Sequence, residues 1–135
     1  MRFALVALLA LLLPAAAISA DVPSNDPAAA SEQWLRLLDQ KDYGASWREA
    51  SPEFKKRLSE DMWTDAVAKV RGPLGPVTVR KVANVTNTKS LPGLPDGDYA
   101  VVQFQTAFAN KANAVETVTL IGGADGARVG GYFIK

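Results

Sequence analysis

Hydrophobic positions in the first half of the chain recur every three or four residues, the spacing of one face of an α-helix. Trp34 and Leu38 follow this spacing and predict a helix over residues 28–40. A second, shorter helix is expected over residues 43–50, with Trp47 on its apolar face. Each of these helices needs a partner surface that covers its apolar side.

Two more helix starts and one helix stop can be read further along the chain. Ser51 can cap a helix that begins with Pro52, and residues 59–61 (Ser-Glu-Asp) repeat this signal, so a break or bend is expected there. Gly72 is predicted to end the last helix in a left-handed conformation, because Pro73 prevents continuation. The apolar stripe of this last helix is expected at Trp63, Ala66, Val67 and Val70.

The second half of the chain changes to an alternation of period two, rich in β-branched and aromatic residues. Turn residues separate four expected strands, at residues 77–86, 99–108, 114–121 and 128–134. Helices followed by strands predict an α+β fold, with the N-terminal helices packed on a curved four-stranded antiparallel meander. We expect a single domain over residues 28–135. The two glycines inside the last strand, Gly130 and Gly131, suggest a bulge or the close approach of a helix.

The same alternation predicts how the second and third strands pair. A three-residue loop, 111–113, with Asn113 in a left-handed conformation, places Phe108 opposite Glu116 and keeps the apolar faces together. The next hairpin then places Phe133 opposite Glu116. The sequence therefore predicts that Glu116 lies on the apolar face between two phenylalanines, where an ionised carboxylate must be paired or must reach the rim.

Two interpretations of Glu116 follow. In the first, which is favoured, it forms a structural ion pair with Lys81 or Arg80. Alternation favours Lys81, because it shares its face with the apolar residues Val79 and Val85. In the second, Glu116 is the polar anchor of an apolar ligand pocket between helices and sheet. That pocket would be lined by Glu116, Trp34, Trp47, Trp63, Phe104, Phe108 and Phe133, although the three tryptophans fit an ordinary core equally well.

The amino-acid composition disfavours several classes of function. The 15 basic and 14 acidic residues give a net charge of +1, which disfavours a nucleic-acid-binding protein. The chain has no cysteine and no histidine, so it lacks disulfides and the commonest general base and metal ligand. We predict no metal site, no cofactor and no catalytic residue. An isomerase or hydratase that used Glu116 with Tyr99 or Tyr132 is disfavoured, because alternation turns both tyrosines outward.

The first 20 residues have the pattern of a secretory signal peptide. Arg2 precedes an apolar run over residues 3–13, Pro14 ends it, and small residues follow, with cleavage expected after Ala17 or Ala20. The run is shorter than the roughly 20 residues that a membrane-spanning helix needs. We therefore expect an exported, periplasmic or secreted protein with a linker over residues 21–27, in contact with a membrane only through the uncleaved signal.

Several stretches resemble a known family: YGASWREASPEFK, VRGPLGPVTVRKV, LPGLPDGDYAVVQFQTAFANKANAVETVTL and GGYFIK. The chain from Trp34 to Lys135 is similar to the domain of unknown function 4019, a family of small exported bacterial proteins. By analogy, the resemblance implies a fold like nuclear transport factor 2 or cystatin, and it brings no catalytic residues.

From the chain as a whole we expect an exported, non-enzymatic binding or accessory domain, with an apolar pocket for a small apolar ligand. The alternative is a protein-interaction or homodimerisation module that uses the exposed sheet face or an edge strand.

Overall fold

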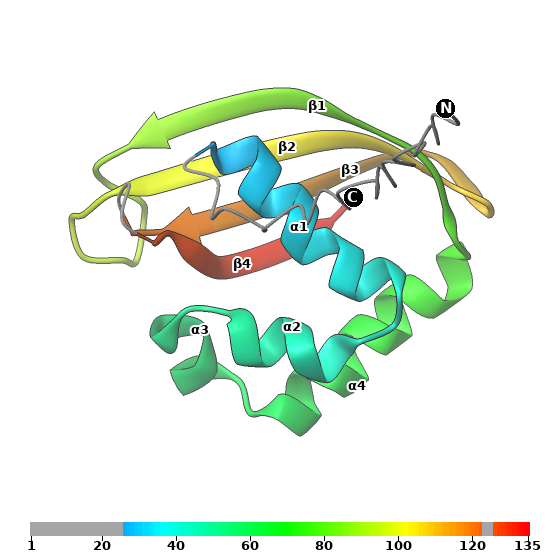
Figure 1. Cartoon of the computed structure of the whole chain (residues 1–135), viewed down its shortest axis with the longest axis horizontal. Helices are drawn as coiled ribbons and strands as arrows, with labels where there is room; N and C mark the ends of the chain where they lie inside the picture. Colours follow the sequence, from blue (N-terminus) through cyan, green and yellow to red (C-terminus); the bar gives the residue numbers. More distant parts are fainter. Residues whose placement is uncertain (1–25, 123–125) are drawn as a thin grey trace, which may run out of the picture.

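The computed structural model describes residues 26–122 and 126–135, and it has the α+β architecture that the sequence predicts (Figure 1). The expected signal peptide, 1–20, and linker residues 21–25 lie outside the described residues, whereas Pro27 already belongs to the first helix. The helices are α1 Pro27–Asp39, α2 Tyr43–Glu49, α3 Pro52–Arg57, α4 Glu60–Arg71 and the short 3₁₀ helix η1 Gly72–Leu74. The strands are β1 Val77–Thr88, β2 Tyr99–Phe108, β3 Lys111–Ile121 and β4 Arg128–Ile134.

Side-chain caps set the helix starts. The hydroxyl of Ser51 accepts a hydrogen bond from the backbone N–H of Phe54, and Ser59 does the same for Met62, so the expected break between α3 and α4 is confirmed. The expected left-handed cap at Gly72 is wrong. Gly72 has right-handed angles, φ −53° and ψ −53°, because the chain continues into η1, and the positive φ of +74° falls at Gly75 instead.

The buried face of α4 also differs from the prediction at its end. Trp63 and Val67 are buried as expected, but the next buried position is Arg71, and Val70 is 50% exposed. Positions four residues apart lie on one helical face, so the stripe that includes Trp63 and Val67 continues to Arg71. The sequence pattern alone favoured valine over arginine for this place.

The four strands form one antiparallel sheet in the order β1-β2-β3-β4, so the predicted meander is confirmed. The predicted β2–β3 loop is wrong, because residues 111–113 belong to β3 and the turn is Ala109-Asn110. Phe104, rather than Phe108, therefore pairs with Glu116. A shift of four residues preserves the face of every side chain, so Glu116 still points to the helix side of the sheet.

A β-bulge in β4 decides which residues of the last strand face the helices. Val129 pairs with Leu120 and Gly131 pairs with Thr119, so Gly130 is an extra residue. Beyond the bulge Tyr132 lies on the helix side, opposite Val118, and Phe133 lies on the outer face and is 51% exposed. The expectations that Tyr132 points outward and that Phe133 points inward are both wrong, because one extra residue exchanges the two faces of a strand.

The helices lie against one face of the sheet, and the hydrophobic core fills the space between them (Figure 1). Buried Ser46 of α2 connects three helices. Its backbone carbonyl accepts a hydrogen bond from the Trp34 indole at 2.9 Å, and its hydroxyl accepts one from the Trp63 indole at 2.9 Å. The core residues of largest size are Trp34, Leu35, Leu38, Phe54, Trp63, Val67, Val102, Phe104, Val118, Leu120 and Val129.

Candidate functional site

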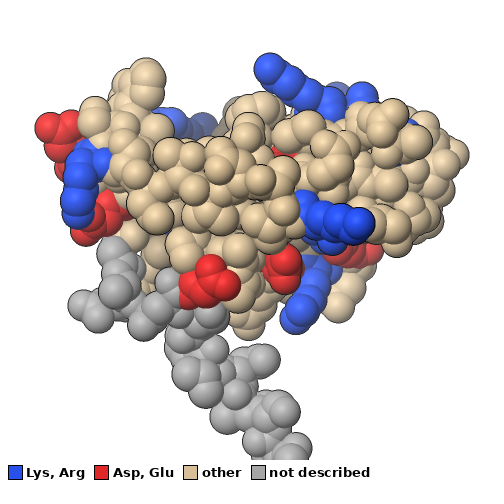
Figure 2. All heavy atoms as spheres, turned by 90° about the horizontal axis from the view of Figure 1, so that it is seen from above, with Lys and Arg blue, Asp and Glu red and all other residues tan. Residues whose placement is uncertain are grey.

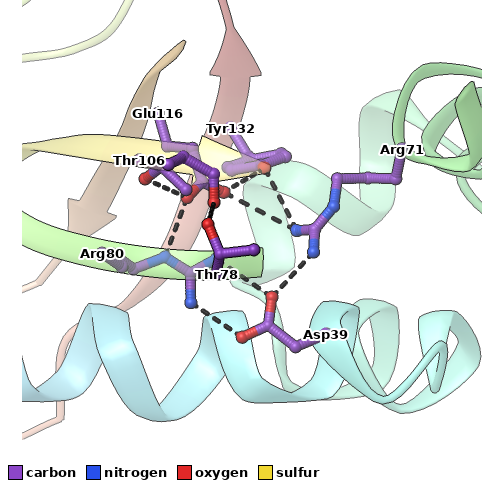
Figure 3. Close-up of polar contacts among 8 residues, drawn as sticks. Asp39, Arg71, Thr78, Arg80, Thr106, Glu116 and Tyr132 are labelled. Carbon is purple, nitrogen blue, oxygen red and sulfur yellow. Dashed lines mark hydrogen bonds and ion pairs between the residues drawn. The ribbon is translucent and has the colours of Figure 1, made fainter. Parts of the chain in front are cut away.

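Glu116 is fully buried on the helix side of β3, and its carboxylate accepts hydrogen bonds from three side chains. Its Oε1 atom accepts hydrogen bonds from Arg80 Nε at 2.8 Å and from Thr106 Oγ1 at 2.6 Å. Its Oε2 atom accepts one from the Tyr132 hydroxyl at 2.5 Å (Figure 3). Burying an isolated carboxylate is costly, and these donors replace the water that Glu116 would otherwise bind.

Asp39 and Arg71 extend these contacts into an ion-pair network. Arg71 Nη1 lies 3.6 Å from Glu116 Oε2, and Arg71 Nη2 lies 2.7 Å from Asp39 Oδ1. Arg80 donates to both Asp39 oxygens, at 2.7 Å and 3.0 Å (Figure 3). We call Asp39, Arg71, Arg80 and Glu116 the four-charge network; its two positive and two negative groups cancel.

The four-charge network joins four elements that are distant in the sequence. Asp39 is the last residue of α1, Arg71 is the last residue of α4, Arg80 lies on β1, and Glu116 lies on β3. Arg71 also lies over the ring of Phe108, 5.0 Å from its centroid. The network therefore attaches the C-terminal ends of two helices to the buried face of the sheet.

Asp39 and the two arginines of this network favour one another's charged forms. Burial raises the pKa of the Asp39 carboxyl, but hydrogen bonds from Arg80 and Arg71, together with the positive charges of both, outweigh burial and leave this pKa below its ordinary value. Burial lowers the pKa of Arg71 and of Arg80, but the hydrogen bond to Asp39, together with further contributions that include the charge of Glu116, more than reverses this, so both pKa values are raised. Burial, followed by the charge of Glu116, raises the pKa of Tyr132, which therefore keeps its proton and donates it.

Glu116 is arranged as a structural anchor. Both of its oxygens already accept hydrogen bonds, and its side chain has no exposed surface. A general base must reach the proton of a substrate at hydrogen-bonding distance, and here protein donors occupy those positions. Glu116 therefore interacts with groups of the protein itself, and these interactions hold the helices against the sheet.

The structure places Arg80, and not the favoured Lys81, beside Glu116. β1 contains bulges at Thr78 and Ala83, which the sequence pattern did not reveal. Arg80 pairs with buried Thr106 and so faces the helices, which leaves Lys81 on the outer face. The expectation for Lys81 is wrong because a bulge exchanges the faces of the strand, and with it Val79 also turns outward.

The tryptophans and phenylalanines of the expected pocket do not share one environment. Trp34, Trp63, Phe104 and Phe108 are buried, Trp47 is half-buried, and Phe133 lies on the opposite face of the sheet. Trp34 packs edge-on against Tyr132, with ring centroids 5.6 Å apart, and Trp63 packs edge-on against Phe54 at 4.9 Å. Trp47 donates its indole N–H to the carbonyl of Leu58 at 2.8 Å.

Sequence reasoning missed four members of the site: Asp39, Arg71, Thr106 and Tyr132. One signal could have found Arg71, because it lies four residues after Val67 on the buried stripe of α4. No sequence signal identifies Asp39 at the end of α1. Tyr132 could be found only by including the bulge at Gly130 in the register.

A shallow polar depression of about 250 Å³ lies between α1 and β1. Its walls are Glu32, Arg36, Asp39 and Arg80, so it opens onto the outer side of the four-charge network. Across residues 26–122 and 126–135, no group of three acidic side chains is placed to hold a metal ion. Within the same ranges, no helix has the length and apolar composition needed to cross a membrane.

Residues 30–132 match the model of a family described as a protein of unknown function, DUF4019. The match covers most of the chain, so the protein belongs to this family. No curated protein and no solved structure matches the chain.

Proposed function

We propose that this DUF4019 family member is an exported, non-enzymatic accessory domain that binds other protein chains by adding a strand along β1. The observation that carries the proposal is the open edge of β1. β1 is 12 residues long, pairs with β2 on one side, and has no strand on its other side in the part of the chain that the structure describes. Such an edge presents unpaired backbone N–H and C=O groups to another extended segment.

Side chains along β1 support the same proposal. Val79, Val82 and Val85 are 50%, 42% and 37% exposed, and they make up half of the six large hydrophobic side chains exposed among the described residues. From Val82 to Thr88 the strand carries no charge. Natural edge strands are usually shielded by charges, so a long uncharged stretch with exposed valines favours a binding edge.

The surface around the β1 edge also carries few charged side chains. Figure 2 views the molecule from above, so that the β1 edge of Figure 1 faces the reader, and the middle of this face is largely free of charged side chains. Lys, Arg, Asp and Glu gather toward its ends and its rim. A partner strand would therefore meet backbone groups and valines along most of the edge.

Two further observations support the non-enzymatic and exported parts of the proposal. The buried carboxylate of Glu116, the strongest candidate for acid–base chemistry, is bonded to Arg80, Thr106 and Tyr132. The chain offers no histidine or cysteine in its place. The sequence of residues 1–20 has the pattern of a secretory signal, which supports export.

Site-specific photo-crosslinking in the cells that make the protein tests the proposal. A photoreactive residue replaces Val82 or Val85 in one set of variants, and it replaces Met62, an exposed residue of α4, in the matched control. We expect protein adducts from positions 82 and 85 and none from position 62. Adducts from all three positions alike, or none from β1, would overturn strand addition at this edge.

A further inference from the structure

We infer that the strand added along β1 is β1 of a second copy, which produces a two-fold dimer with one continuous eight-stranded sheet. This inference rests on the proposed function, since it names the occupant of the same edge. Closed two-fold dimers are the commonest protein assemblies, and in them each residue pair occurs twice. An antiparallel pair of β1 strands has this symmetry, so the edge needs only to be complementary to itself.

The pleat of β1 restricts the register of such a pair. Val82 pairs with Phe104, and Val85 pairs with Val102, so both valines face the helix side although they are three residues apart. The bulge at Ala83 is responsible for this. In an antiparallel dimer, residues that face each other across the two strands must share a face.

One register satisfies this condition for every residue from Val79 to Thr88 that pairs with β2, apart from Asn84, which it sets opposite the bulged Ala83, and it also buries the valines. It places Val82 opposite Val85 of the second copy, and therefore Val85 opposite Val82 of that copy. Arg80 then meets Asn87 on the helix side, and Lys81 meets Thr86 on the outer side. No charge faces a like charge, and four valines meet at the two-fold axis.

The neighbouring register that also keeps the faces matched is less favourable. Moved by two residues, it would place Arg80 opposite Val85 of the second copy and leave Val82 opposite the bulged Ala83. A guanidinium would then lie against the valine that the first register covers. We therefore assign the pair in which Val82 meets Val85.

Disulfide trapping tests this assignment cleanly because the chain has no cysteine of its own. Variants Val82→Cys and Val85→Cys are prepared separately as the purified mature protein, mixed, and oxidised. Directly opposed residues lie about 4.5–5.5 Å apart between Cα atoms, a spacing that a disulfide can span. We expect a covalent dimer of twice the monomer mass from the mixture, and little from either variant alone, because three residues separate like positions by roughly 10 Å.

Met62→Cys is the control for random collision, since this side chain is exposed on α4. Trapping of Val82→Cys with itself, or equal trapping of Met62→Cys, would overturn the assigned register. Sedimentation velocity of the unmodified protein gives an independent measurement, with a dimer expected. We also expect Val85→Lys to convert the dimer to a monomer, whereas Phe133→Lys, at an exposed position on β4, should leave it dimeric.

The two proposals can fail separately. A purified protein that is monomeric, combined with photo-adducts at positions 82 and 85 whose mass does not match a second copy, would overturn the dimer and leave strand addition standing. A monomeric protein that gives no adducts from β1 would overturn both.

Discussion

Glu116 shows how one buried residue can be required for stability without adding much net stability of its own. A buried ion pair must first offset the cost of removing its charges from water, so replacing a whole network with apolar residues is often neutral. Removing one member is different, because the remaining charges stay buried without a counter-charge. Glu116 is in this position, with Arg80 and Arg71 both directed at its carboxylate.

We predict that removing the charge of Glu116 lowers the stability of the protein. Glu116→Gln keeps the shape of the side chain and removes its charge, which leaves the two arginines with Asp39 as their one remaining acidic partner in the network. We expect the free energy of unfolding to fall by about 3–5 kcal/mol, measured by urea denaturation. The matched control is Glu60→Gln, which breaks the solvent-exposed pair with Arg48 and should cost about 0–1 kcal/mol. Similar small losses in both variants would contradict the structural role of Glu116.

At the scale of the element, the bulge at Gly130 has the largest consequence. It exchanges the faces of the last strand, brings Tyr132 to Glu116, and turns Phe133 outward. The glycine is needed for space, because a Cβ atom at this position would lie 2.6 Å from Ile121 Cγ1 and closer still to Cδ1. The backbone N–H of Ser51 also donates to the carbonyl of Val129, which holds the start of α3 against the bulge.

A second prediction follows for the two adjacent glycines. Gly130→Ala should lower the free energy of unfolding by about 1–3 kcal/mol, since overpacking forces neighbouring side chains to move. At Gly131 the nearest atom to an added Cβ is Thr119 Cβ at 3.7 Å, an ordinary contact, so Gly131→Ala should cost clearly less. Thermal unfolding compares the two. Because Ile121 supplies the clash, Gly130→Ala should cost less when it is made in an Ile121→Ala background, and an unchanged cost there would show that the clash is not the cause.

At the scale of the whole molecule, helices and sheet are held together by the core and by the four-charge network, without any disulfide. Asp39 contributes to this attachment only while it is ionised. Its pKa in the folded protein lies below the ordinary value of 3.8 because of Arg80 and Arg71. Such a carboxyl has a lower pKa in the folded protein than in the unfolded chain. Its stabilising effect is complete at pH values above the pKa of the unfolded chain, and it is lost as the pH falls through the pKa of the folded protein.

We therefore predict that the stability of the protein falls at low pH. We expect the free energy of unfolding to decrease as pH falls below about 5, where carboxyl groups with ordinary pKa values begin to bind protons in the unfolded chain. Asp39→Asn should be less stable near neutral pH and should decline less steeply in acid, because it lacks the group that releases its proton on folding. Urea denaturation over a pH series measures both slopes. Parallel curves for the two proteins would show that Asp39 does not contribute to the acid sensitivity.

The sequence by itself determined the secondary structure and its order. Caps such as Ser51 and Ser59, the helical spacing of Trp34 and Leu38, and the alternation in β2 act over a few residues, so they can be read locally. The face on which Glu116 lies was also predicted, because an error of four residues in register leaves the face of a strand unchanged.

Only the tertiary structure decided which side chains meet Glu116. Bulges move residues between faces by one position. The paired glycines indicated the bulge at Gly130, but the alternation in β1 gives no sign of the bulges at Thr78 and Ala83. Asp39 and Arg71 reach the network because α1 and α4 both end over the same part of the sheet. The partners of a buried charge are set by packing between distant segments, and that packing exists only in the folded chain.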